Sequence, residues 1–274
     1  MIGRPDPAPD FLVLGGQRCG STWTQECLMA HPDIFVPRRR RGIQFDTEQL
    51  APYGGQPVAG IVNSTLLTEP AAAEAIAAIG REIRLVAILR NPIDRAHSWY
   101  LKRRRDGDEI YAQEISFEAA LDLDPMLVEG GLYHEGLSRY FEHFATDQVL
   151  VLDYDRLARD PATFIREIYA FVGVEPVFEP PQLAGRSNYS AQVRSGAIHQ
   201  AMRKGKRVLW RVSGENGPLM SRIESSALVG RLRRLNERST ATMSVETRDR
   251  LTGVFAAPNA ALADLLGWDL RHWE

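Results

Sequence analysis

The feature that most constrains this sequence is a short apolar run that leads through glycines into a helix-forming segment. Residues 11–14 read Phe-Leu-Val-Leu, and the loop Gly15-Gly16-Gln17-Arg18-Cys19-Gly20 follows directly. An apolar run of this length is typical of a parallel strand that is covered on both faces. The glycines predict a tight loop, and Ser21-Thr22 open a helix that ends near His31-Pro32. A strand, a loop and a helix in this order predict an anion site, because the first N–H groups of a helix have no intrahelical partner.

Further apolar runs alternate with helix-forming segments along the chain. Leu85–Leu89 and Val149–Leu152 predict two more buried strands. Helices are expected near residues 70–79, 93–104, 117–123, 133–145 and 161–172. This alternation predicts an α/β fold with a mostly parallel central sheet flanked by helices. The strand, glycine loop and helix at its start make it similar to the P-loop nucleotide-binding folds. Because no strong linker divides the chain, we expect one domain over residues 1–274.

Composition and charge exclude several classes of protein. The net charge is −2, with 44% hydrophobic and 25% charged residues, so the overall field attracts neither nucleic acid nor an anionic membrane. No apolar run is long enough to span a membrane, and the first residues lack the apolar core of a signal peptide, which predicts a cytoplasmic protein. Two cysteines provide neither a disulfide framework nor a metal-binding set, so no metal is expected. The oligomeric state is left open.

The glycine loop fits the P-loop pattern G-x-x-x-x-G-K-[ST] incompletely. Gly15, Gly20 and Thr22 match it, but Ser21 occupies the position of the phosphate-binding lysine. The cation is instead Arg18, inside the loop, from where it can reach a group at the 5′ end of a nucleotide. A plain glycine turn with a Ser/Thr helix cap is the alternative interpretation of these residues.

The segment from Gln17 to Trp23, followed by His31-Pro32, resembles the 5′-phosphosulfate-binding segment of sulfotransferases that use 3′-phosphoadenosine 5′-phosphosulfate (PAPS). The resemblance implies that Arg18 takes the place of the catalytic cation. It also implies that the PAPS-binding residues of this segment are Arg18, Cys19, Gly20, Ser21, Thr22 and Trp23.

A second segment, from Leu85 to Tyr100, supplies the other half of such a site. Arg90 directly follows an apolar strand, and ligands of open α/β sheets bind outside the carboxyl ends of the strands. Ser98 lies on the helix that follows Asn91-Pro92, where its hydroxyl and the guanidinium of Arg90 could converge on a phosphate. The segment is similar to the 3′-phosphate-binding motif of the same family, which implies that Arg90 and Ser98 bind that group. Alternatively, Arg90 pairs with a surface acid and Ser98 is an ordinary helix residue.

Later segments resemble the family with less specificity. They include residues 133–157 and 235–268, in the manner of bacterial and carbohydrate-type sulfotransferases. Residues 180–214 contain seven Lys or Arg and no acidic residue. Within this stretch, Arg194 is a candidate for the basic loop that closes over the nucleotide in the family, whereas a solvated basic face over 186–211 is the alternative. The arginines at 38–41 could attract an anionic acceptor, although a charge run is more often a solvated loop.

The resemblance implies a reaction without a metal, in which a sulfuryl group moves in line from PAPS to a hydroxyl or amine of a small-molecule or carbohydrate acceptor. Arg18 would stabilise the charge that develops during transfer, but it cannot act as a general acid because arginine keeps its proton. The glutamate that many relatives use as a base falls on Arg41 or Gly42 here. Asp46 and Glu48 are the nearest carboxylates and therefore the candidate catalytic bases. His97 and His134 are further candidates.

Two other functions fit parts of the sequence. Val149–Asp153 imitates the strand and aspartate that hold magnesium in P-loop kinases and nucleoside triphosphatases, although Ser21 argues against that class. The missing glutamate would also fit a relative that binds the nucleotide without catalysis. The identity of the acceptor is not encoded by any short motif.

Overall fold

The computed structural model of the protein describes residues 8–37, 54–106, 108–111, 115–184, 192–193, 237–238 and 243–273. Several sequence-based predictions lie outside these residues: Asp46, Glu48, Arg194, the arginines at 38–41 and, apart from residues 192 and 193, the basic stretch 186–211. The contacts divide the chain into two compact units, the first made of residues 1–96, 126–186 and 248–274, and the second of residues 97–125 and 187–247. The expectation of a single domain stays a prediction.

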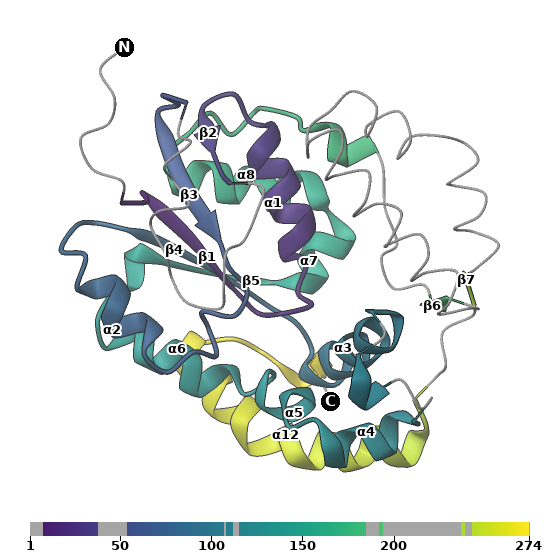
Figure 1. Ribbon diagram of the computed structural model, residues 1–274. Coiled ribbons are helices and arrows are strands. Elements are labelled where there is room, and N and C mark those ends of the chain that lie inside the picture. The colour runs from purple at the N-terminus through teal and green to yellow at the C-terminus, as the bar shows by residue number, and fades with distance from the viewer. Residues whose placement is uncertain are drawn as a thin grey trace. The chain divides into compact units, whose positions relative to one another are not determined.

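The apolar run at residues 11–14 becomes the middle strand of a parallel sheet in the first unit (Figure 1). The strand order is β2-β3-β1-β4-β5, and every neighbouring pair is parallel. The strands are β1 (Phe11–Gly15), β2 (Ile34–Phe35), β3 (Val58–Val62), β4 (Arg84–Leu89) and β5 (Val149–Asp153). Because parallel strands end at the same edge, the turns after β1, β4 and β5 share the carboxyl edge of the sheet.

Helices cover both faces of this sheet. One face packs against α1 (Ser21–Ala30), α7 (Tyr154–Arg159) and α8 (Pro161–Val172). The other packs against α2 (Ala72–Ala77), α6 (Tyr133–Phe141) and α12 (Val245–Leu266), whose first residues belong to the second unit. The first unit also contains the short helix α5 (Met126–Glu129). Short 3-10 turns lie at Thr146–Gln148, Pro181–Ala184 and Arg271–Trp273. The predicted α/β class with a parallel sheet is confirmed.

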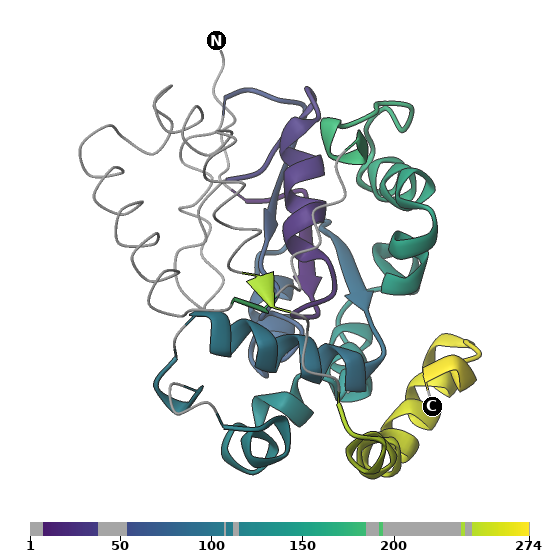
Figure 2. The same cartoon turned by 90° about the vertical axis from the view of Figure 1, so that its right-hand side faces the viewer.

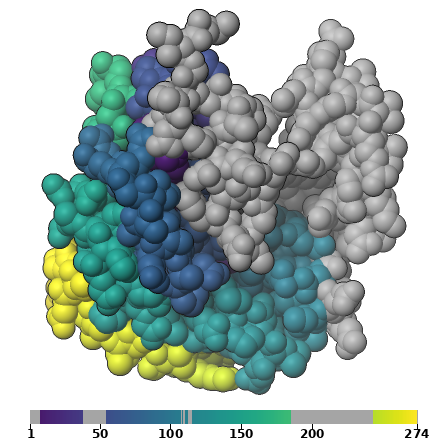
Figure 3. Space-filling view, turned by 60° about the vertical axis from the view of Figure 1, so that its left-hand side comes forward, coloured from purple at the N-terminus to yellow at the C-terminus, as the bar shows by residue number. Residues whose placement is uncertain are grey.

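The alternation of side chains along β1 builds two cores. Phe11 and Val13 point to the face that is covered by α1 and α8, which run beside each other in Figure 2. Leu12 and Leu14 point to the opposite face, which packs against α2 and α6. The C-terminal helix α12 adds Leu262 to this second core, to which α6 contributes Leu137 and Tyr140. Figure 3 shows the C-terminal part of the chain in yellow beside teal atoms. Successive residues of a strand face opposite sides, so one apolar run serves both layers.

The second unit contains most of α3 (Pro92–Asp106), the 3-10 turn Glu109–Tyr111, α4 (Phe117–Leu123) and the two-residue pair β6 (Gln192–Val193) and β7 (Glu237–Arg238). Ring contacts hold the described part of this unit together, since Tyr100 packs against both Tyr111 and Phe117. Asp124 accepts hydrogen bonds from the hydroxyl of Tyr111 at 2.6 Å and from the indole of Trp99 at 3.1 Å.

Of the helices in the described part of the chain, none combines the length and the apolar character needed to cross a membrane.

Candidate active site

The loop after β1 contains three residues with positive φ, and two of them are glycines, for which this conformation carries little cost. Gly15, Arg18 and Gly20 have φ angles of 112°, 69° and 85°. Arg18 is the one non-glycine residue with positive φ in the described part of the chain. Side chains disfavour this region because Cβ crowds the backbone, at a cost of about 1–3 kcal/mol at strained functional positions. Contacts within the fold must therefore impose the conformation of Arg18.

Two hydrogen bonds tie this loop to the end of β4. The amide of Gly16 donates to the carbonyl oxygen of Ile88 at 2.6 Å. The guanidinium of Arg90 donates through Nη1 to the carbonyl oxygen of Arg18 at 3.3 Å. The predicted 5′-phosphate loop and the predicted 3′-phosphate arginine are therefore in direct contact.

The N-terminus of α1 is not capped by a side chain. Gly20 occupies the cap position, and the first turn of the helix contains no acidic residue. The positive φ of Gly20 favours glycine there, and a Cβ at this position would lie 2.6 Å from Cδ2 of Leu157, whose side chain would have to move. Ser21 is buried, whereas Thr22 is exposed beside it. The unpaired N–H groups and the positive end of the helix dipole suit a bound phosphate.

Arg90 is placed as the sequence predicts, directly after β4 at the carboxyl edge of the sheet. Its guanidinium carbon lies 4.7 Å from the centroid of the Tyr154 ring. This ring supports the planar group through a cation–π contact. A guanidinium carries several N–H donors, so the contact with Arg18 leaves donors for a phosphate.

The other predicted cofactor residues differ in their surroundings. Ser98 is buried on α3 and belongs to the second unit, so its convergence with Arg90 stays a prediction. The ring of Trp23 packs edge-on against Phe164, with centroids 6.5 Å apart. Cys19 is fully buried and its amide donates to the carbonyl oxygen of Gly16 at 3.3 Å. Roles of Trp23 and Cys19 in binding also stay predictions.

The thiol of Cys19 lies against a residue that the sequence analysis does not select, Tyr133. Sγ is 3.7 Å from the hydroxyl of Tyr133, which itself donates to the carbonyl oxygen of Arg90 at 2.9 Å. Burial raises the pKa of Cys19, despite the opposing charges of nearby arginines. The thiol is therefore protonated at neutral pH and is a packing group rather than a nucleophile. No local sequence motif marks this tyrosine of an amphipathic helix as a neighbour of Cys19 and Arg90.

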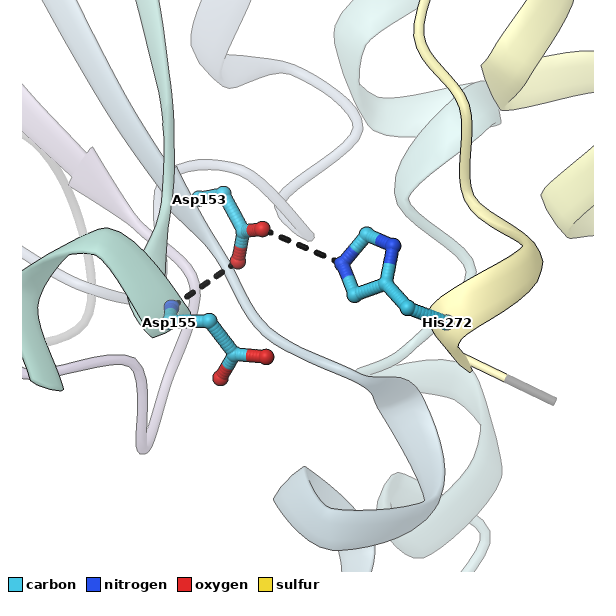
Figure 4. A group of neighbouring side chains, drawn as sticks. All are labelled: Asp153, Asp155 and His272. Atoms are coloured by element: carbon cyan, nitrogen blue, oxygen red, sulfur yellow. Dashed lines mark hydrogen bonds and ion pairs between the residues drawn. The ribbon is translucent and has the colours of Figure 1, made fainter. Parts of the chain in front are cut away.

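The carboxylate of Asp153 at the end of β5 has two partners (Figure 4). Its Oδ1 accepts from the amide of Asp155 at 2.9 Å and thereby caps α7. Its Oδ2 lies 3.2 Å from Nε2 of His272. Each of these three residues offers one potential metal-ligand atom, and these atoms lie within 4.8 Å of one another. In a P-loop kinase the corresponding carboxylate would hold magnesium. Here both oxygens of Asp153 already have partners, the amide of Asp155 and the ring of His272.

The general base is not assigned by the described residues. His97 packs its ring against Phe117 and Tyr100 inside the second unit, with ring centroids 5.2 and 6.1 Å away. His134 is half-buried on α6. The two carboxylates that are the nearest sequence candidates lie outside the described residues.

The chain is similar in sequence to proteins that are named as sulfotransferases. The sulfotransferase domain family matches residues 8–211. The chain is 28% identical over 199 residues to the bifunctional heparan sulfate N-deacetylase/N-sulfotransferase 4 of Mus musculus, an alignment that covers 62% of this chain and 23% of the mouse protein. Its counterpart 1 from Caenorhabditis briggsae is 25% identical over 286 residues, with coverage of 94% and 30%. The chain therefore spans about a quarter to a third of the length of these relatives.

Solved structures agree on the fold. A sulfotransferase from Alicyclobacillus acidocaldarius superposes with a TM-score of 0.69 at 21% identity, over 97% of this chain and 98% of that one. The sulfotransferase domain of the Synechococcus PCC 7002 olefin synthase gives a TM-score of 0.53 at 13% identity, over 98% of each chain. With the family matched over most of the chain and the parallel α/β architecture shared, the chain belongs to the sulfotransferase family of enzymes.

Proposed function

We propose that the chain transfers a sulfuryl group from PAPS to a hydroxyl or amine, with Arg18 next to the group in transfer. The observation that carries this proposal is the loop at the start of α1, where an arginine with positive φ stands beside an uncapped helix N-terminus and contacts Arg90. The donor groups fit a ligand with two anionic ends. Backbone N–H groups and hydroxyls suit the 5′ end, and the guanidinium of Arg90 suits the 3′-phosphate.

The reaction forms one bond to sulfur and breaks another. The acceptor oxygen or nitrogen attacks sulfur from the side opposite the bridging oxygen, and the sulfur–oxygen bond to the 5′-phosphate breaks. The electron pair of that bond stays on adenosine 3′,5′-bisphosphate, and the acceptor proton leaves to a base. Arg18 stabilises the growing negative charge by its own charge and by paired hydrogen bonds, because a guanidinium does not give up its proton. Most of the rate enhancement would come from positioning and charge stabilisation.

A carbohydrate acceptor is the class to test first. The named relatives act on heparan sulfate according to their names, and each is called an N-sulfotransferase. This chain spans only part of their length, so their N-deacetylase activity is not included in the proposal. A small-molecule acceptor, a cytoplasmic location and catalysis without a metal stay predictions from the sequence.

A transfer assay tests the proposal. Purified protein is incubated with PAPS labelled in its sulfate and with a panel of amino sugars, uncharged sugars, uronic acids and phenols, in the presence of a chelator. We expect label in at least one acceptor and stoichiometric formation of adenosine 3′,5′-bisphosphate. Binding of the bisphosphate without transfer to any acceptor in the panel or in a cell metabolite extract would instead favour the non-catalytic relative.

A further inference from the structure

Tyr133 stands between the two segments that are assigned to the two ends of the nucleotide. It is the first residue of α6 and is 2% exposed. Its hydroxyl donates to the carbonyl oxygen of Arg90 at 2.9 Å. On the other side, a Cβ at Gly16 would lie 3.1 Å from Cε1 of the ring. One side chain therefore contacts the loop after β1 with its ring and the end of β4 with its hydroxyl.

The surroundings of Tyr133 leave its ring and hydroxyl little freedom. Trp273 packs edge-on against the ring, with centroids 6.1 Å apart, and the thiol of Cys19 lies 3.7 Å from the hydroxyl. Burial raises the pKa of Tyr133 well above its ordinary value. The hydroxyl therefore keeps its proton at physiological pH and remains a donor to the Arg90 carbonyl.

The backbone of Arg90 is held from a second direction as well. The neighbouring Asn91 is buried, and its Nδ2 donates to the carbonyl oxygen of Trp273 at 2.9 Å. Its Oδ1 accepts from the amide of Ile93 at 2.9 Å. The turn after β4 is thus fixed on one side by Tyr133 and on the other by Asn91.

We propose that Tyr133 is a positioning residue, which holds the loop of Arg18 and the turn of Arg90 at a fixed separation so that the two ends of the nucleotide bind as a unit. This inference rests on the proposed function. Deleting the hydroxyl would loosen the separation without removing any group that contacts the ligand. The affinity should therefore decrease for ligands that contact both segments and stay nearly unchanged for ligands that contact only one.

Tyr140 provides a matched control. It lies on α6 about two helical turns after Tyr133 and is 1% exposed. Its hydroxyl also donates to a main-chain carbonyl oxygen, that of Leu66, at 3.1 Å. Burial raises the pKa of this tyrosine as well. Both Tyr→Phe changes delete a hydrogen bond from a buried tyrosine to a main-chain carbonyl oxygen, but only that of Tyr133 is made to a proposed phosphate-binding segment. Tyr133→Phe also removes the weak contact with the thiol of Cys19.

The experiment compares wild type, Tyr133→Phe and Tyr140→Phe by isothermal titration with three probes. Adenosine 3′,5′-bisphosphate carries both phosphates, whereas adenosine 5′-monophosphate and adenosine 3′-monophosphate carry one each. We expect Tyr133→Phe to weaken bisphosphate binding about three- to tenfold, the scale of one neutral hydrogen bond, and to weaken either monophosphate less than about twofold. Tyr140→Phe should leave all three affinities unchanged. Thermal unfolding should register a similar loss of stability in both variants.

Two results would overturn the inference. In the first, Tyr133→Phe weakens the three probes equally. In the second, both variants bind the bisphosphate like wild type. Failure of the proposed function is a distinct outcome, because wild type would then bind no bisphosphate, and the role of Tyr133 would fail with it.

Discussion

The ends of β1 and β5 differ in the charged and capping groups that surround them. Both strands end at one edge of the same parallel sheet, and each is followed by a helix. After β5, the carboxylate of Asp153 caps α7, and Asp155 adds a second acid in the first turn. After β1, α1 begins with glycine at its cap and no acid in its first turn. The fold therefore neutralises the N-terminus of α7 internally and leaves that of α1 without a side-chain cap or an acid in its first turn, as the proposed phosphate site requires.

The position of arginine sharpens this contrast. Arg18 lies inside the uncapped turn, and Arg90 contacts it from the neighbouring strand end. At the β5 end, the carboxylate of Asp153 contacts the imidazole of His272, on the 3-10 turn Arg271–Trp273, in addition to the amide of Asp155. We therefore expect these two strand–helix junctions to attract charges of opposite sign, because their side chains differ although their topology is the same.

The largest expected effect comes from Arg18→Ala. Turnover in the transfer assay should fall about 100- to 1,000-fold, the usual loss when one group that stabilises transition-state charge is removed. Affinity for adenosine 3′,5′-bisphosphate should change much less, as measured by titration calorimetry. Arg18→Lys, which keeps the charge without the planar fork, should lie between wild type and alanine. Equal losses in turnover and in nucleotide affinity would contradict a role at the transferring group.

Arg90→Ala should weaken nucleotide binding by about 1.5–3 kcal/mol, the range for a hydrogen bond to a charged group. The measurement is the affinity for adenosine 3′,5′-bisphosphate relative to that for adenosine 5′-monophosphate. Arg84→Ala is the matched control, because Arg84 begins the same strand and donates to the carbonyl oxygen of Phe171 at 2.8 Å. If Arg90→Ala binds the bisphosphate like wild type, the proposed position of the 3′-phosphate at the end of β4 is wrong.

Thr22→Glu makes the α1 end resemble the α7 end. A carboxylate in the first turn should stabilise the folded protein by about 0.3–1 kcal/mol through the helix dipole. The same charge should weaken bisphosphate binding about tenfold by repulsion, which corresponds to about 1.4 kcal/mol. Chemical denaturation and calorimetry measure the two effects. Thr22→Gln removes the hydroxyl without adding charge, so a glutamate variant that binds as well as the glutamine variant would refute the anion site.

The smallest effect on ligand binding is expected from Asp153→Ala. Loss of the cap on α7 should lower the free energy of unfolding by about 1 kcal/mol. Affinity for the nucleotide should stay at the wild-type level in calorimetry. A fall in affinity comparable to that of Arg90→Ala would mean that the β5 end takes part in the site.

Much of the fold follows from local sequence patterns. The strands at residues 11–14, 85–89 and 149–152 are wholly apolar runs, and their predicted bounds agree with β1, β4 and β5 within a residue. The helices predicted at 117–123 and 161–172 agree with α4 and α8. These elements are predictable from the sequence because each has a continuous apolar run, or apolar residues at helical spacing with a cap or a proline at the start.

The local sequence does not predict the strands and helices that depend on contacts with residues far away in the chain. Strand β3 contains Gly60, which weakens a strand pattern, yet a Cβ there would lie 2.2 Å from the ring of Phe11. The ring of the neighbouring strand fills the space, so only the folded structure explains the glycine. The sequence pattern does not predict helix α12 either, because Pro258 in its interior is a residue that normally ends a helix.

The candidate site divides in the same way. Arg18 and Arg90 were selected because a motif and a strand end mark them. The positive φ of Arg18 and the contacts of Tyr133 depend on residues far apart in the sequence, so no local pattern encodes them. Ser98 and the base remain predictions that biochemical experiments can test.

Calorimetry of the wild-type protein with adenosine 3′,5′-bisphosphate and with ATP, in a chelator and then in magnesium, tests the central claim most directly. An uncapped helix N-terminus flanked by Arg18 and Arg90 should bind the bisphosphate with the same affinity in both buffers, and should bind ATP weakly or not at all. Tight, magnesium-dependent binding of ATP without binding of the bisphosphate would contradict the assignment of this site.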